Sequence, residues 1–163
     1  MKIAILSDIH DHTNHLLSAL ATAEITGCER MLFLGDMVHA STFSLLLEEW
    51  EKPLDLVFGN NEYEEEAFSA MAAASRHATL HGEYGVVKCD GQLLFFCHLP
   101  QLALRALETK QFDAVFYGHT HCAECRQLGT TLLANPGEVL GRSSIPGIGV
   151  YDTETREFLH YSI

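Results

Sequence analysis

The sequence has few basic residues and no long apolar segment. It contains 10 lysines and arginines against 22 aspartates and glutamates, which gives a formal net charge of -12. A charge of this sign repels the phosphate backbone of DNA or RNA and the surface of an anionic membrane. No apolar run approaches the roughly 18 residues that a transmembrane helix needs. These absences argue against a protein that binds long nucleic acids and against one that spans or lies on a membrane.

The chain also lacks the pattern of a secretory signal and a cysteine content typical of disulfides. Met1 leads directly into an apolar, strand-like segment, without the charged and apolar regions of a signal peptide. The five cysteines are odd in number. Cys122 and Cys125 form a lone pair at the start of a predicted strand, where ordinary strand cysteines are more common than a metal or redox site. We therefore expect a reduced, cytoplasmic protein.

No linker, repeat or low-complexity segment divides the chain, so we expect a single domain over residues 1–163. In the first half, apolar runs typical of buried strands alternate with segments typical of helices. The expected strands are residues 2–7, 30–35 and 54–59, and the expected helices are residues 14–27, 41–51 and 62–74. Asn14, and Ser41 or Thr42, are the expected N-caps of the first two helices, and Gly27 is the expected end of the first. This alternation predicts a parallel sheet.

The second half of the chain has more strands. Asp90-Gly91 lies between two apolar runs, and this pattern is a strong signal for a β-hairpin. The expected strands are residues 84–89, 92–97, 112–118, 123–129, 130–135, 147–152 and 156–162, with one helix at residues 100–110. Exposed apolar strands in small α/β domains often pair with a second copy, so we expect a homo-oligomer.

Side chains that bind metals follow five of the expected strands. They are Asp8 and His10, Asp36, Asn60, His98, and His119 and His121. In open α/β sheets, ligand sites lie beyond the carboxyl ends of the strands. Residues i and i+2 of an extended segment point the same way. We therefore expect Asp8 with His10, and His119 with His121, each to face one site.

Four histidines, two aspartates and one asparagine are too many ligands for one tetrahedral ion. Two ions about 3.5 to 4 Å apart that share a carboxylate would use all seven. Nitrogen and oxygen ligands without thiolates suit transition metals better than Mg²⁺ or Ca²⁺. Any one of these pairs alone would more often be a turn or a cap, but five such elements together make that explanation improbable. The ligand set predicts two divalent transition-metal ions. We expect manganese, with iron, nickel and zinc as alternatives.

In order and spacing, these motifs resemble those of the calcineurin-like metallophosphoesterases. The resemblance rests on Asp8-x-His10, Gly35-Asp36, Gly59-Asn60-Asn61-Glu62, His98 and Gly118-His119-Thr120-His121, and it covers the whole chain. Residues 7–12, 135–138 and 145–149 (SDIHDH, NPGE and IPGIG) are similar to small prokaryotic phosphodiesterases of the YfcE/MJ0936 type. The family implies an α/β fold, a four-layer αββα sandwich of two mixed sheets.

The resemblance also implies a dinuclear site and a reaction. By motif, Asp8, His10 and His121 hold one ion, Asn60, His98 and His119 hold the other, and Asp36 bridges them. The implied enzyme is a metal-dependent phosphoric diester hydrolase that acts on a small phosphoester. Its reaction would be in-line attack of a metal-bridging hydroxide on phosphorus.

Asn61 is the candidate catalytic residue at which the chain departs from many relatives outside this subgroup. They have a histidine there, which can protonate the leaving group, whereas an amide cannot donate a full proton. Asn61 therefore favours substrates with good leaving groups or a different acid, for which His12 and His39 are candidates. No arginine follows Asp36 closely, so protein phosphatase and dinucleoside tetraphosphatase activities are less favoured.

Two other classes of function stay open at this point. The first is a scaffold without catalytic activity, because a trafficking subunit with this fold serves as a protein-binding surface. Loss of a ligand would mark that case, and all seven ligand positions are filled here. The second is a structural-metal protein, which would hold its ions without an open coordination position.

Overall fold

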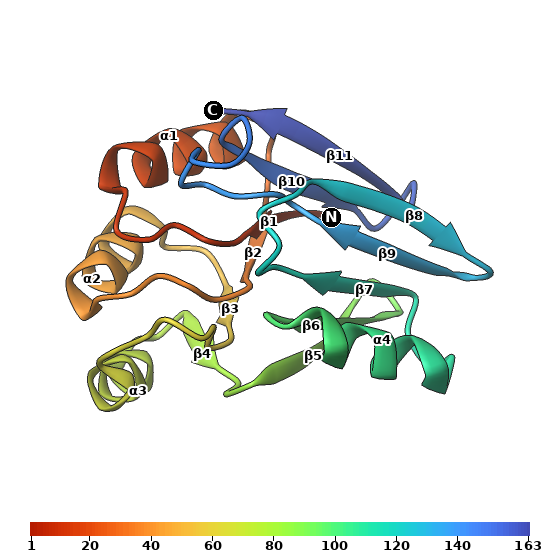
Figure 1. The fold of residues 1–163 in the computed structure, drawn as a ribbon, viewed down its shortest axis with the longest axis horizontal. Coiled ribbons are helices and arrows are strands. Elements are labelled where there is room, and N and C mark those ends of the chain that lie inside the picture. Colours follow the sequence, from red (N-terminus) through yellow and green to blue (C-terminus); the bar gives the residue numbers. More distant parts are fainter.

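The computed structural model describes residues 1–163 as two β-sheets that face each other, with helices on their outer surfaces (Figure 1). In chain order the elements are β1 (Lys2–Leu6), α1 (Thr13–Ile25), β2 (Arg30–Phe33), α2 (Ala40–Glu49), β3 (Leu54–Leu56), α3 (Glu65–Ala74), β4 (Ala78–Leu80), β5 (Tyr84–Cys89), β6 (Gln92–Cys97), α4 (Pro100–Thr109), β7 (Ala114–Tyr117), β8 (Glu124–Leu128), β9 (Thr131–Asn135), β10 (Gly147–Asp152) and β11 (Glu157–Ser162). Every expected helix and strand is present, with ends that differ from the prediction by at most three residues.

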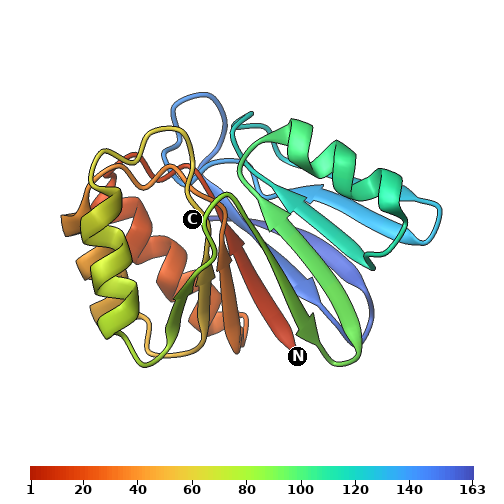
Figure 2. The same ribbon diagram turned by 90° about the horizontal axis from the view of Figure 1, so that it is seen from below.

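The first sheet has six strands in the order β11-β10-β1-β2-β3-β4. β1, β2, β3 and β4 are parallel neighbours, as the alternation of strands and helices predicts. β10 and β11 extend the sheet with antiparallel pairs. The carboxyl ends of β1, β2 and β3 therefore lie at one end of the sheet, opposite the N-terminus of the chain (Figure 2).

The second sheet has five strands in the order β5-β6-β7-β9-β8. β6, β7 and β9 are parallel, and β5 and β8 are antiparallel strands at the two edges. β5 and β6 form the hairpin expected from Asp90-Gly91, and both turn residues have positive φ. Such a turn matches the twist of the strands that it joins.

Apolar side chains fill the spaces between four layers. α1, α2 and α3 cover the outer face of the first sheet, and α4 covers β6 and β7 of the second (Figure 1). Within β1, Ile3 and Ile5 lie in the core between the sheets, whereas Ala4 and Leu6 lie in the core beneath the helices. Burial on both faces explains the unbroken apolar run of this strand. The expected four-layer αββα sandwich of two mixed sheets is thus confirmed.

The ends of α1 agree only in part with the prediction. The helix begins before Asn14, and His12 is the N-cap, because its Nδ1 atom accepts a hydrogen bond from the backbone amide of His15 at 3.2 Å. The predicted Asn14 cap is therefore wrong. Gly27 does follow the helix end, with φ of 77° and a backbone hydrogen bond to Glu24. None of the four helices combines the length and hydropathy that a membrane span requires.

The start of α2 also differs from the prediction. The helix begins at Ala40, so neither Ser41 nor Thr42 is its N-cap. The Thr42 hydroxyl instead donates to Asp11 at 2.6 Å, and Glu64 accepts a hydrogen bond from the amide of Ala40 at 2.8 Å. A carboxylate from a distant segment thus takes the role that the local sequence assigns to a hydroxyl.

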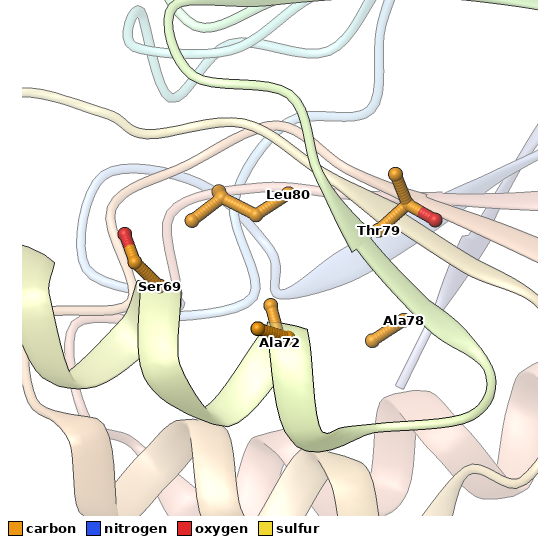
Figure 3. A pocket seen from close by; sticks show the side chains of 6 residues that line it. Ser69, Ala72, Ala78, Thr79 and Leu80 are labelled. Carbon is orange, nitrogen blue, oxygen red and sulfur yellow. The ribbon is translucent and has the colours of Figure 1, made fainter.

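β4 has no counterpart among the expected strands. It is only three residues long, and Thr79 is exposed between two partly buried neighbours, so it gives no clear hydrophobic pattern. Its parallel pairing with β3 places it at the edge of the first sheet. Beside it, Ser69 and Ala72 of α3 face Ala78, Thr79 and Leu80 of the strand across a hollow (Figure 3).

Gly85 leaves room for a core phenylalanine on the neighbouring strand. Gly85 pairs with Phe96 in the register of β5 and β6, and a β-carbon at Gly85 would lie 2.1 Å from Phe96 Cζ. The Phe96 ring is fully buried between the sheets, so it cannot move aside without strain. We expect Gly85→Ala to lower the free energy of unfolding by about 1 to 3 kcal/mol in urea denaturation. Lys88→Ala, an exposed change on the same strand, should stay within about 0.5 kcal/mol of wild type. Equal effects of the two variants would contradict this explanation.

Candidate functional site

The loops after β1 and β2 run beside each other beyond the first sheet and bring ligand side chains together. The amide of Asp8 donates to the carbonyl of Gly35, and that of His10 to the carbonyl of Asp36, both at 3.0 Å. From the second sheet, the amide of His119 donates to Asp8 Oδ2 at 3.0 Å. Both sheets therefore contribute to one site, at the end of the molecule where the loops gather (Figure 2).

Five of the seven predicted ligands have a left-handed backbone. φ lies between 45° and 68° at Asp8, His10, Asp36, His119 and His121. The extended backbone predicted for Asp8 with His10, and for His119 with His121, is therefore wrong. Asp8 and His10 nevertheless lie together, whereas His121 lies beside Asp8 and His119 lies beside His98. The chain instead turns sharply after β1, β2 and β7. Non-glycine residues in this conformation cost free energy and are concentrated at functional sites.

Asp8, His10 and His121 form one group, with ligand atoms within 4.8 Å of one another. Asp8 Oδ1 lies 3.3 Å from His121 Nε2 and 3.9 Å from His10 Nε2. Neither Asp8 Oδ1 nor His10 Nε2 has a hydrogen-bond partner, although both atoms are buried. Buried polar atoms without partners are costly and rare. A cation between these three side chains would satisfy both atoms, so the group fits a metal ion.

His98, Asn60 and His119 form a second group. His98 Nδ1 donates to the carbonyl of Leu34 at 2.8 Å, which leaves Nε2 with its lone pair. This Nε2 atom lies 3.0 Å from Asn60 Oδ1 and 3.3 Å from His119 Nδ1. Burial lowers the pKa of His98 below its usual value, which favours the neutral imidazole. The His98 and Asn60 atoms that face each other are thus both electron-pair donors, as a cation site requires.

Asp36 lies between the two groups. Its Oδ2 atom is 3.4 Å from His10 Nε2, and its Oδ1 atom is 3.4 Å from His98 Nε2. Oδ1 also accepts hydrogen bonds from the amides of Asn60 at 2.8 Å and Asn61 at 3.0 Å. Oδ2 accepts one from the Asn61 side chain at 2.6 Å. One buried carboxylate thus faces both groups, and Asn61 holds it in place.

Glu138 belongs to the site, although it is not among the predicted ligands. Its Oε2 atom accepts a hydrogen bond from His121 Nδ1 at 2.5 Å, and Oε1 accepts one from the amide of Ser144 at 2.7 Å. Burial raises the pKa of Glu138, but the hydrogen bonds from His121 and the loop amides outweigh this effect and lower it. The carboxylate fixes the His121 tautomer with Nε2 toward Asp8. The available signal was a strand of the fully buried type followed closely, after Pro136 and Gly137, by a glutamate.

Glu62 joins two of the ligand loops. Its two carboxylate oxygens accept hydrogen bonds from the amides of Met37 at 3.0 Å and Gly59 at 2.7 Å. Burial raises the pKa of this carboxyl. Because both carboxylate oxygens of Glu62 accept hydrogen bonds from these loops, Glu62 lies outside α3. The helix begins at Glu65, three residues after the predicted start. Only glycine fits at position 59, where a β-carbon would lie 2.1 Å from Asp36 Oδ1.

The two candidate acids, His12 and His39, make their contacts outside the two ligand groups. His12 caps α1, and its ring stacks on His15 with 3.7 Å between centroids. His39 is exposed, and its Nδ1 atom lies 2.5 Å from Asp11 Oδ2. The hydrogen bond to Asp11 raises the pKa of His39. Neither ring hydrogen-bonds to any of the seven predicted ligands.

Comparisons with known proteins identify the family of this chain. A family model described as the calcineurin-like phosphoesterase superfamily domain matches residues 1–156. The phosphodiesterase MJ0936 of Methanocaldococcus jannaschii is 29% identical over 164 residues, which cover 97% of this chain and 96% of that protein.

Two solved structures show the same architecture. One, described as a novel archaeal phosphodiesterase, has a TM-score of 0.92 and 26% identity, with 100% of both chains covered. The other, the phosphoesterase YfcE from E. coli, has a TM-score of 0.66 and 22% identity, also over 100% of both chains. At this identity the similarity supports the fold only. Because the family model spans nearly the whole sequence, the chain belongs to the calcineurin-like phosphoesterase superfamily.

Proposed function

We propose that this protein is a dinuclear-metal-dependent phosphodiesterase that hydrolyses a small phosphoester. The observation that carries the proposal is the pair of buried, unpartnered atoms Asp8 Oδ1 and His10 Nε2, in a cluster of ligand side chains supplied by both sheets. Membership of a phosphoesterase family supports the reaction class. The phosphodiesterase name of the archaeal relative supports a diester substrate.

The proposed ligands divide into two groups that share one carboxylate. Asp8, His10 and His121 would hold one ion, Asn60, His98 and His119 the other, and Asp36 would bridge them. When bound, two divalent ions activate a water molecule as the nucleophile and neutralise charge on the phosphoryl group. The mixed ligand set suits divalent transition metals, and we propose manganese, with iron, nickel and zinc as alternatives.

The other side chains of the site set the geometry of these ligands. Glu138 orients His121, and the carbonyl of Leu34 orients His98, so that the two Nε2 atoms keep their lone pairs for a cation. Asn61 holds Asp36 and cannot protonate a leaving group. We therefore propose that diesters with good leaving groups are better substrates than monoesters.

We also propose that the protein is cytoplasmic, and its free cysteines support this location. All five are free thiols, and Cys122 and Cys125 are exposed to solvent. None of the five belongs to a ligand group. Exposed thiols without partners are typical of compartments in which glutathione keeps cysteine reduced.

Hydrolysis assays of the metal-stripped protein test the proposal directly. The substrates are bis-p-nitrophenyl phosphate and p-nitrophenyl phosphate, with Mn²⁺, Ni²⁺, Zn²⁺ or Mg²⁺ added back in turn. We expect turnover only after metal is restored, and faster turnover of the diester. Tight metal binding without turnover of either ester would overturn the proposal in favour of a scaffold.

The substitution Asp36→Asn removes the shared carboxylate charge and is the most direct single-residue test of the site. We expect Asp36→Asn to lower the rate of diester hydrolysis by more than about 100-fold and to release at least one ion, because the bridging charge is lost. Metal content by elemental analysis and the rate on bis-p-nitrophenyl phosphate measure the two effects. Asp90→Asn, in the exposed β5–β6 turn, is the control that should change neither. Unchanged metal content in Asp36→Asn would disprove the bridging role.

Glu138 offers a test of the support for His121. We expect Glu138→Gln to weaken binding of the ion held by Asp8, His10 and His121 by about 10 to 100-fold, because the orienting charge is lost. Calorimetric titration of the metal-stripped protein gives the affinity. Glu154→Gln, in the exposed turn before β11, is the control. An affinity equal to that of wild type would show that Glu138 supports only the loop at Ser143 and Ser144.

Asn61 offers a test of leaving-group protonation. We expect Asn61→His to raise turnover of monoesters with poor leaving groups, because an imidazolium can donate the proton that an amide cannot. Rates on substituted phenyl phosphates, plotted against the pKa of the leaving phenol, should show a shallower slope than wild type. An unchanged slope would mean that another group donates the proton.

A further inference from the structure

A cavity of about 580 Å³ lies beside the second group of proposed ligands. Its wall includes His98, and the rest comes from the loop after β3, the start of α3, the link between β4 and β5, and α4. No other proposed ligand lines it. The cavity therefore borders the proposed reaction centre and extends away from it. Such a position suits the part of a substrate that does not react.

The lining of the cavity has an apolar part and two walls of opposite charge. Phe58, Leu99 and Leu102 supply the apolar surface. Glu65 from α3 and Glu83 from the β4–β5 link are its acidic residues, whereas its only cation comes from α4. The arrangement fits an apolar chain or ring with a polar end.

Arg105 is that cation, and it has no partner in the protein. Arg30, Arg126 and Arg156 each form an ion pair with a carboxylate. Arg105 forms neither an ion pair nor a hydrogen bond, although Glu65 lines the same cavity and the chain has a net charge of -12. In so acidic a protein, an unpaired guanidinium next to a cavity is free to bind an anionic group of a ligand.

We infer that this cavity binds the ester arm that is not cleaved, and that Arg105 selects arms that carry an anionic group. The inference rests on the proposed phosphodiesterase function. Glu65 and Glu83 repel such a group, so they direct it toward α4 rather than toward the opposite wall. The first turn of α4, which has no side-chain cap, adds a favourable dipole on the same side. The substrate class is therefore a small diester with a second acidic function.

Matched pairs of esters test this inference. Each pair has the same p-nitrophenyl leaving group, and its second arm is either an alkyl chain or an ω-carboxyalkyl chain of equal length, in a short and a long version. We expect the metal-loaded wild-type protein to prefer the carboxylated ester of at least one pair in kcat/KM. Arg105→Gln should reduce this preference about tenfold, and Arg105→Glu should reverse it. Arg105→Lys should retain part of it.

Arg76→Gln is the matched control, because Arg76 is also exposed and unpaired but does not line this cavity. We expect it to keep the wild-type preference. Turnover of both esters with the same ratio in wild type and Arg105→Gln would overturn the inference and leave the proposed function intact. Absence of turnover of either ester by the metal-loaded wild type would overturn the proposed function, and the inference with it.

Discussion

The burial of the Asp36 carboxylate between two groups of ligand side chains is the constraint on which the site depends. This carboxylate and that of Asp8 are almost fully buried, and no lysine or arginine pairs with either of them. Burial of carboxylates without compensation is strongly unfavourable. The amides of Asn60 and Asn61 and the Asn61 side chain supply part of the compensation. Divalent cations would supply the rest, which explains why so many left-handed residues are retained around this point.

The sequence predicts well which side chains gather at this site, and it predicts poorly which residues support them. Ligands such as Asp8 and Asp36 directly follow apolar strands, and the parallel order of these strands brings them together without further information. Glu138 and Glu62 act through contacts with residues far along the chain, at His121 and Met37, which no local pattern reveals. The same reason explains the wrong cap of α2, where Glu64 binds the amide of Ala40, and the absence of β4 from the expected strands. These features depend on contacts with distant parts of the chain rather than on local secondary-structure propensity.

The charge of the protein has different consequences for the ligands and for the substrate. A net charge of -12 disfavours the approach of any phosphoester. Bound divalent ions would reverse the sign of the potential at the ligand groups, and Arg105 would offset part of the acidic charge of the neighbouring cavity. Both effects are confined to the site and its cavity. A small anionic ester can therefore enter there, whereas a long nucleic acid would be repelled along most of its length. The acidic surface thus contributes to the choice of substrate.

The division of the ligands between the two sheets links metal binding to the packing of the whole fold. Asp8 and Asp36 follow strands of the first sheet, and His98 and His119 follow strands of the second. Their relative position is set by the apolar layer between the sheets, in which Phe96 lies. Ions that bind only this assembled arrangement stabilise the native state by mass action. A change in the core between the sheets would therefore alter metal affinity without a change of any ligand. The reason is that each ligand group combines residues from both sheets, so its geometry depends on the distance between the sheets.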